Sequence, residues 1–152
     1  MQQIFNGIGV TQVSTSLKKK ETLKIILDSN AFFIPLEFKI DIFSEVKNLI
    51  NRNVNFILLS PVKRELELLA AKESPKIRRE ATYALKLAEK CQYVTVDNDE
   101  KLRTDDVIIK VAQAWRSPVF TNDSQLRKKL RDIRVPVIYV RQKSRLEIDG
   151  LI

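Results

Sequence analysis

The sequence has no histidine, only three glycines and a single cysteine among its 152 residues. The lack of histidine excludes Ser-His-Asp and Cys-His catalysis and every zinc site that needs an imidazole ligand. Residues 10 to 149 contain no glycine, so the glycine-rich phosphate loops of Walker and dinucleotide-binding motifs are excluded as well. Cys91 cannot form an intrachain disulfide, and a lone thiol of this kind is typical of a packed residue in a reducing compartment.

Long apolar runs are also missing. Ala31–Leu36 and Phe56–Leu59 fall far below the roughly 18 residues that a membrane span requires. The first 22 residues lack the basic start and apolar core of a secretory signal. We therefore expect a soluble, cytoplasmic protein with no membrane partner.

Positive charge is in excess, because 27 Lys and Arg residues outnumber 19 Asp and Glu residues and give a net charge of +8. This excess favours a polyanionic partner, with nucleic acid as the first candidate. The length predicts one globular domain. Residues 1–22 are predicted to be an N-terminal extension, either flexible or an edge strand, and residues 23–152 to pack as a unit.

Short apolar segments alternate with helical patterns from Leu23 onward. Ser60 and Ser74 each precede a proline and are predicted to cap the helices that follow. The alternation predicts an α/β fold, a three-layer α/β/α sandwich around a central parallel sheet of about five strands. The predicted strands are 23–27, 56–59, 93–96, 118–120 and 136–140, and the predicted helices are 42–50, 61–72, 75–91, 105–115 and 124–133.

Acidic residues stand where predicted strands end. Asp28 closes the first strand and Asp123 follows the fourth. Each could simply cap the next turn or helix, but ligands of parallel sheets bind beyond the carboxyl ends of the strands, so the repetition favours a shared site. In the helix after the second strand, Glu65 borders the apolar stripe while Glu67 faces water.

A fourth acid comes from Asp105 or Asp106, at the start of another predicted helix. Both lie off the apolar stripe, so periodicity does not distinguish a ligand from a cap. Two like charges about 5 Å apart cost roughly 3 kcal/mol at an effective dielectric near 20, and four charges would together rival the stability of a domain. A cation relieves this repulsion, and a site without His or Cys favours Mg²⁺ or Mn²⁺, ions that promote phosphodiester hydrolysis.

Basic residues are concentrated around and after Asp123. Residues 116–145 contain nine basic residues and only two acids, Asp123 and Asp132, for a net charge of +7. A solvated helix face would explain any single lysine, but the segment as a whole predicts a track for RNA phosphates. The predicted RNA-binding residues are Arg127, Lys128, Lys129, Arg131, Arg134, Arg141, Lys143 and Arg145.

Five segments, taken in order, resemble the PIN domain family. The last of them and the Asp105-Asp106 pair are more similar to the ribosomal-RNA-processing branch, especially its archaeal members, than to the VapC toxins. The resemblance extends from about residue 23 to the end of the sequence. The segments are Leu27–Phe32, Ser60–Glu67, Thr104–Ile108, Thr121–Asp123 and Val135–Leu146.

The resemblance implies a metal-dependent endoribonuclease site with Mg²⁺ or Mn²⁺ as its cofactor. It assigns the catalytic and metal-binding roles to one residue from each of four segments and prefers Asp106 to Asp105, which becomes an auxiliary residue. It also implies that two auxiliary residues, Asn30 and Thr121, hold acids in place. A homodimer is consistent with the family. The implied quartet is Asp28, Glu65, Asp106 and Asp123.

The leading hypothesis is an endoribonuclease that acts on RNA, in particular ribosomal precursor RNA. One alternative is a VapC-like toxin ribonuclease with an antitoxin partner. Another is an RNA-binding ribosome-assembly factor that cleaves weakly or not at all. An aspartyl phosphotransferase that uses Asp28 as nucleophile is disfavoured, because the residue two positions later is Asn30 rather than a second acid.

Overall fold

The computed structural model describes residues 4–5, 22–97 and 102–152. Within these residues, seven strands form one mixed sheet in the order β1-β4-β3-β2-β5-β6-β7. All neighbouring pairs are parallel except β6 and β7. The strands are β1 (Ile4–Phe5), β2 (Leu23–Leu27), β3 (Val54–Leu59), β4 (Gln92–Val96), β5 (Val119–Phe120), β6 (Val137–Arg141) and β7 (Arg145–Asp149).

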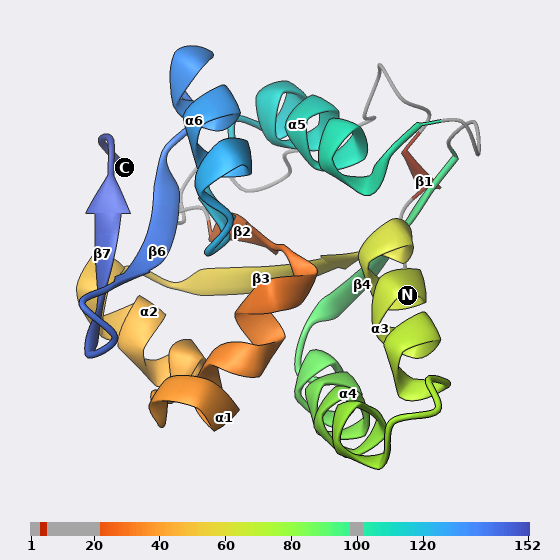
Figure 1. The fold of residues 1–152 in the computed structure, drawn as a ribbon. Helices are drawn as coiled ribbons and strands as arrows, with labels where there is room; N and C mark the ends of the chain where they lie inside the picture. The colour runs from red at the N-terminus through yellow and green to blue at the C-terminus, as the bar shows by residue number, and fades with distance from the viewer. Residues whose placement is uncertain (1–3, 6–21, 98–101) are drawn as a thin grey trace.

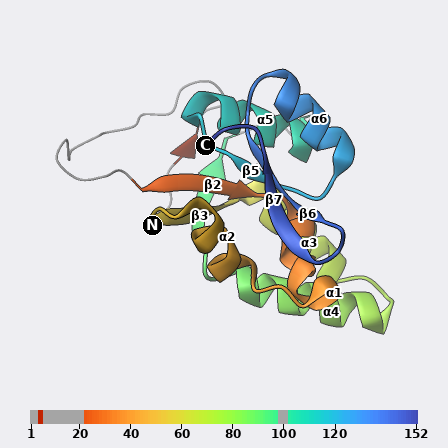
Figure 2. The same ribbon diagram turned by 90° about the vertical axis from the view of Figure 1, so that its left-hand side faces the viewer.

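Helices cover both faces of the sheet, as Figures 1 and 2 show, with α5 and α6 on one face and α1, α2 and α4 on the other. The predicted three-layer α/β/α fold is therefore confirmed. The helices are η1 (Ser29–Phe33, a 3₁₀ helix), α1 (Ile34–Phe38), α2 (Ile42–Ile50), α3 (Ser60–Ala70), α4 (Pro75–Ala88), α5 (Thr104–Trp115) and α6 (Ser124–Asp132).

The apolar runs become the buried strands at the centre of the sheet. Ile25, Ile26 and Leu27 of β2 are fully buried because β2 pairs with β3 on one side and β5 on the other and lies between two helical layers. Among the helices of the described ranges, none combines the length and the apolar character that a membrane crossing demands.

Helix starts follow the predicted signals with one exception. The Ser74 hydroxyl accepts a hydrogen bond from the Ile77 amide and so caps α4. The prediction that Ser60 caps α3 is wrong, because Ser60 is already the first residue of that helix. Its buried hydroxyl instead accepts a hydrogen bond from the Val96 amide at 2.9 Å, which ties the end of β4 to the start of α3.

Strand β7 was not anticipated, and the turn before it explains why. Gln142 and Lys143 both have positive φ, 55° and 57°, and the Ser144 amide donates a hydrogen bond to the Arg141 carbonyl. Hairpin turns with positive φ usually carry Gly, Asn or Asp, and none of these residues occurs in the three-residue turn 142–144. The strand beyond the turn alternates charged and apolar residues, and only Leu146 is fully within the core.

The single thiol behaves as a packed residue. Cys91 is half-buried and directly precedes β4, and burial raises the pKa of its thiol to about 12. Since the thiolate is the reactive form of cysteine, this side chain is unreactive at neutral pH.

Two leucines of α3 test the packing directly. Leu66 is fully buried and Leu68 is 62% exposed. We expect Leu66→Ala to lower the free energy of unfolding by about 2–5 kcal/mol, since it leaves a cavity in the core. The matched control Leu68→Ala should change it by no more than about 0.5 kcal/mol. Urea denaturation measures both values, and equal values would contradict the packing described here.

Candidate metal-dependent nuclease site

Backbone pairing brings the ends of three strands to one edge of the sheet. The Asp28 amide donates to the Phe120 carbonyl at 2.9 Å, and the Thr121 amide donates to the Ile138 carbonyl at 3.0 Å. The residues that follow β2 and β5 are therefore neighbours, although the chain separates them by more than ninety positions.

Asp28 is a buried carboxylate, only 4% exposed, with both oxygens hydrogen-bonded. The Thr121 hydroxyl donates to its Oδ2 at 2.7 Å, and the Asn30 amide group donates to the same oxygen at 3.2 Å. The Ser29 backbone amide donates to Oδ1 at 2.8 Å. These bonds fix the position of the carboxylate, so Asp28 does more than cap the turn that follows it.

Asp123 is tied to Asp28 through Thr121, whose hydroxyl accepts a hydrogen bond from the Asp123 amide at 3.1 Å. The Oδ1 atom of Asp123 caps α6 by accepting hydrogen bonds from the Gln125 and Leu126 amides. Asp123 thus caps α6 and also lies at the same edge of the sheet as Asp28. Asn30 reinforces the junction, because its Oδ1 accepts from the Asn122 amide at 2.9 Å.

Like charges act on one another at this edge. Burial raises the pKa of Asp28 to about 6; hydrogen bonds from Thr121 and Ser29 oppose the rise, and the charges of Asp105 and Glu65 add to it. Such a shift reflects a carboxylate that is costly to ionise where it stands.

Asp105 of the acidic pair interacts electrostatically with the other carboxylates. Burial and the charges of Asp123 and Glu65 raise the pKa of Asp105, while those of Arg103 and Lys129 lower it. Neither acid of the pair is the N-cap of α5, a position that Arg103 occupies without a side-chain hydrogen bond. The assignment implied by the resemblance, which gives the main role to Asp106 and an auxiliary role to Asp105, stays a prediction.

The donor set suits a hard dication. The carboxylate that follows β2, those of α3 and α5 and that of the β5–α6 connection repel one another, and the ligands that Mg²⁺ prefers are oxygens of this kind. Within the described residues, no three acidic or cysteine side chains converge closely enough to enclose a metal ion. Mg²⁺ does not require such a cage, because it keeps several waters and is usually held by one or two carboxylates together with substrate phosphates.

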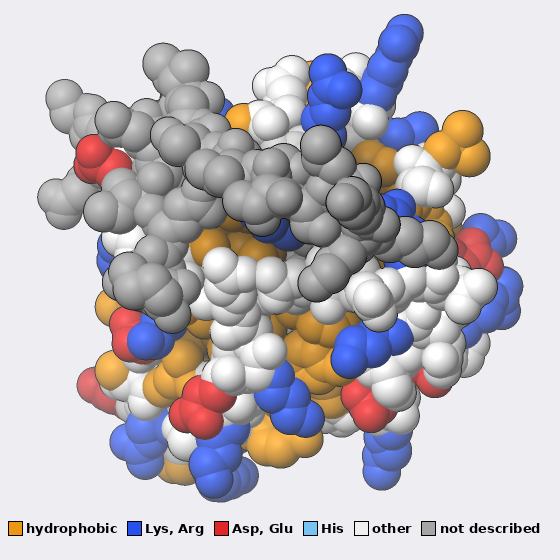
Figure 3. Space-filling view, turned by 180° about the vertical axis from the view of Figure 1, so that it is seen from behind, with side chains coloured by type: hydrophobic (Ala, Val, Ile, Leu, Met, Phe, Trp, Pro, Cys, Tyr) orange, Lys and Arg blue, Asp and Glu red, His pale blue; other side chains and the backbone are white. Residues whose placement is uncertain are grey.

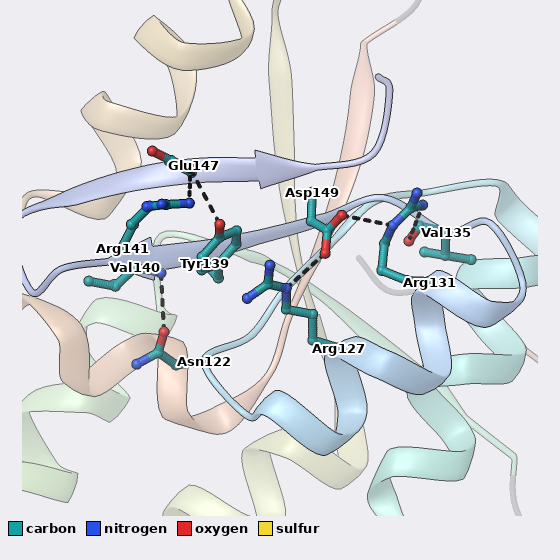
Figure 4. A network of polar contacts seen from close by, with 9 residues as sticks. All are labelled: Asn122, Arg127, Arg131, Val135, Tyr139, Val140, Arg141, Glu147 and Asp149. Carbon is teal, nitrogen blue, oxygen red and sulfur yellow. Dashed lines mark hydrogen bonds and ion pairs between the residues drawn. The ribbon is translucent and has the colours of Figure 1, made fainter.

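Two of the predicted RNA-binding arginines share a carboxylate of β7, as Figure 4 shows. The Nε atoms of Arg127 and Arg131 lie 2.9 Å and 3.1 Å from the two oxygens of Asp149. The Arg127 guanidinium also lies over the Tyr139 ring, 3.6 Å from its centroid. Arg131 is held further by a bond from Nη1 to the Val135 carbonyl.

A second carboxylate of β7 is shared in the same way. Arg141 and Arg145 both contact Glu147, at 3.4 Å and 2.9 Å, and the Tyr139 hydroxyl donates to it at 3.3 Å. Four of the eight predicted cations are therefore partly neutralised by acids that lie just beyond the basic segment of the sequence.

The other four predicted cations are exposed, but they do not lie together. The charge of Lys129 reaches Asp105, and Lys128 and Lys143 lie on the surface. Arg134 lies beyond the C-terminal end of α6 and lines a cavity with Arg52 and Arg116 at the opposite edge of the sheet. Figure 3 likewise shows Lys and Arg side chains scattered over the back of the molecule rather than gathered in one patch.

Several residues of the site region escaped sequence reasoning. Arg103 acts on Asp105, and its position directly before the Thr-Asp-Asp segment was the available signal. Tyr139 supports Arg127, but an aromatic residue in an apolar strand has no distinguishing pattern. Glu147 and Asp149 were missed together with β7.

The structure is a three-layer α/β sandwich with carboxylates at the C-terminal edge of its parallel strands. The sequence matches the PIN like domain family over residues 25–143. The chain belongs to this family, and the family prediction is confirmed.

Two archaeal relatives are similar along most of their length. Ribonuclease VapC4 of Methanocaldococcus jannaschii is 30% identical over 129 residues, which are 85% of this chain and 98% of the relative. Ribonuclease VapC9 of Archaeoglobus fulgidus is 26% identical over 126 residues, which are 83% of this chain and 89% of the relative.

Solved structures share the fold. The PIN domain endonuclease Utp24 superposes with a TM-score of 0.71 at 22% identity, covering 85% of this chain and 92% of that one. VapBC2 from Rickettsia felis, bound to a DNA fragment from its promoter, gives a TM-score of 0.52 at 14% identity over 70% of this chain and 92% of that one. Both structures are similar to this chain in fold.

The pKa of Asp28 predicts a pH dependence of stability for the metal-free protein. Below about pH 4 the carboxyl is protonated in both the folded and unfolded chain, and between pH 4 and 6 the folded chain binds more protons. The free energy of unfolding therefore falls as the pH rises through this window, by about 3 kcal/mol for a shift from 3.8 to about 6.

Asp28→Asn removes this titration. We expect the stability of the variant relative to wild type to increase by that amount between pH 4 and pH 7, in urea denaturation with a chelator present. A difference that stays constant across the window would show that Asp28 ionises at the same cost in both states.

Proposed function

We propose that this chain is a divalent-metal-dependent endoribonuclease that hydrolyses phosphodiester bonds of RNA. The observation that carries the proposal is the mutual influence of carboxylates from four separate segments, with Asp28 buried among them. Membership of the PIN like domain family supports it, as do the two archaeal relatives, which are named ribonucleases.

The geometry suggests a division of labour among the acids. Asp28 is positioned before substrate arrives, because Thr121, Asn30 and Ser29 already hold it. Asp123 uses Oδ1 to cap α6, and Oδ2 makes no hydrogen bond with any described residue, so this oxygen is available as a ligand. When bound, Mg²⁺ or Mn²⁺ would polarise the scissile phosphate and lower the pKa of a water.

Two further carboxylates complete the site in this proposal. Glu65 lies in the second turn of α3 and Asp105 in the first turn of α5, and their charges reach Asp28. The N-terminal end of a helix favours a negative side chain, so the first turn of α5 is a suitable place for the Asp105 carboxylate.

Substitution of the acids tests the proposal. Asp28→Asn and Asp105→Asn should each abolish RNA cleavage that depends on Mg²⁺ or Mn²⁺, because each removes a charge that holds the ion. Asp106→Asn should have a smaller effect, and Thr121→Val should lower the rate about 10–100-fold, as loss of a partner to a metal ligand does.

Glu67→Gln is the matched control for Glu65→Gln, since Glu67 is exposed on the same helix. Cleavage of a labelled RNA, followed on a gel with each metal and with a chelator, measures all variants. Wild-type activity in Asp28→Asn would sink the assignment. RNA binding that survives loss of every acid, without any product, would point to an assembly factor instead.

For the cellular role, we propose processing of ribosomal precursor RNA in the cytoplasm. The supporting features are the Asp105-Asp106 pair and the closing segment 135–146, which are similar to the rRNA-processing branch. The named relatives favour a second candidate, a VapC-type toxin ribonuclease with an antitoxin partner.

Expression of the chain in a bacterial host distinguishes the two roles. A toxin should arrest growth, and Asp28→Asn should relieve the arrest. For a processing enzyme we expect no arrest, together with accumulation of uncleaved ribosomal precursor when the protein is depleted from its own cell. Arrest that requires Asp28 would overturn the processing role but leave the nuclease assignment standing.

A further inference from the structure

A polar cleft of about 400 Å³ lies between the start of α6 and strand β6. Thr121 and Asn122 line it immediately before Asp123, so the cleft opens beside the acidic edge. None of its lining residues is acidic, and two of them, Arg127 and Arg141, are basic. Ser124 and Tyr139 also line the cleft.

Arg127 is held rigidly in the wall of this cleft. Its guanidinium lies 3.6 Å from the centroid of the Tyr139 ring, and its Nε donates to Asp149 at 2.9 Å, an arrangement seen in Figure 4. The side chain remains 33% exposed, and its two Nη groups make no hydrogen bond with any described residue. A planar guanidinium fixed in this way needs little ordering to bind an oxyanion.

The nearby end of α6 cannot supply the same contact. Its amides at Gln125 and Leu126 already donate to Asp123, so the usual helix N-terminal donors are occupied. The Arg127 guanidinium, which lines the cleft, is therefore better placed than these two amides to bind an anion.

Net positive charge remains after the internal ion pairs are counted. Arg127 and Arg131 share one carboxylate, that of Asp149, and this group keeps one positive charge. Arg141, at the rim of the cleft, belongs to a similar group around Glu147. Each acid positions its arginines without cancelling them.

We propose that this cleft binds the phosphodiester next to the scissile one in an RNA strand, with Arg127 as the fixed donor and Arg141 at the rim. The inference rests on the proposed function, because the acids define where the scissile phosphate lies. The contact is to the backbone rather than to a base, so it should contribute equally for all RNA sequences.

A comparison of two arginines that share a carboxylate tests this site. Arg127→Gln and Arg131→Gln each remove one ion pair to Asp149 and one charge, with equal exposure of the two side chains, but only Arg127 lines the cleft. Both are made in an Asp28→Asn background, so that a fluorescent single-stranded RNA is bound without being cleaved. Binding is measured by anisotropy over a range of salt concentrations.

We expect Arg127→Gln to weaken binding about tenfold, as loss of a charge-assisted hydrogen bond does, and to reduce the salt slope by about 0.7. Arg131→Gln should cause a clearly smaller loss. Arg127→Lys should restore the salt slope but only part of the affinity, because it keeps the charge and loses the planar fork. Arg78→Gln, on the exposed surface of α4, controls for net charge and should bind as the parent does.

Thermal melting of each variant checks that it is folded. If Arg127→Gln does not fold, the comparison of Arg127→Lys with the parent still tests the site. Equal losses for Arg127→Gln and Arg131→Gln, or full affinity in Arg127→Lys, would overturn the phosphate site. Cleavage by the otherwise wild-type chain is measured separately. If that chain cleaves RNA while binding ignores Arg127, the cleft proposal alone fails; if binding requires Arg127 but no divalent metal supports cleavage, the proposed function alone fails.

Discussion

The hydrogen bond from Thr121 to Asp28, 2.7 Å long and fully buried, is the contact on which the site depends. It joins the ends of two strands that are adjacent in the sheet and distant in the chain. Burying a carboxylate beside other carboxylates opposes folding, and bonds of this kind offset part of that cost. Because Thr121 also accepts from the Asp123 amide, one hydroxyl sets the relative position of two acids.

This constraint distinguishes Asp28 from an ordinary helix cap. Asp41 also begins a helix and accepts an amide hydrogen bond, but it is exposed, and water solvates its charge. Asp28 caps η1 in a similar way, yet it is buried where like charges act on it. The difference lies in the parallel pairing of β2 with β5, which buries the end of a central strand. The buried carboxylate lowers the free energy of unfolding, and a bound cation would raise it again.

The sequence was informative where a local pattern coincides with a tertiary constraint. Asp28 and Asp123 follow buried strands, so topology alone places them at one edge, and Glu65 follows from the face of its helix. The choice between Asp105 and Asp106 had no such support, because both lie off the apolar stripe in the first turn of α5. It depends on how α5 is oriented over the sheet, which periodicity does not encode.

The basic segment shows a different kind of limit. The basic segment ends at Arg145, and Glu147 and Asp149, the acids that pair with its arginines, come directly afterwards. The two acids contact these arginines because a hairpin turn without glycine folds β7 against β6. No local sequence pattern predicts that turn.

The sharing of these two carboxylates changes what the arginines can do. A freely solvated track of eight cations would attract RNA by long-range charge and release it readily as salt rises. Guanidinium groups fixed by an acid and an aromatic ring lose less conformational entropy on binding, so under the proposed function they would position a strand rather than merely attract it. The exposed lysines, and the basic side chains scattered over the face drawn in Figure 3, would provide the attraction. The proposal thus assigns attraction and positioning to different residues, and only the positioning residues need the β6–β7 hairpin.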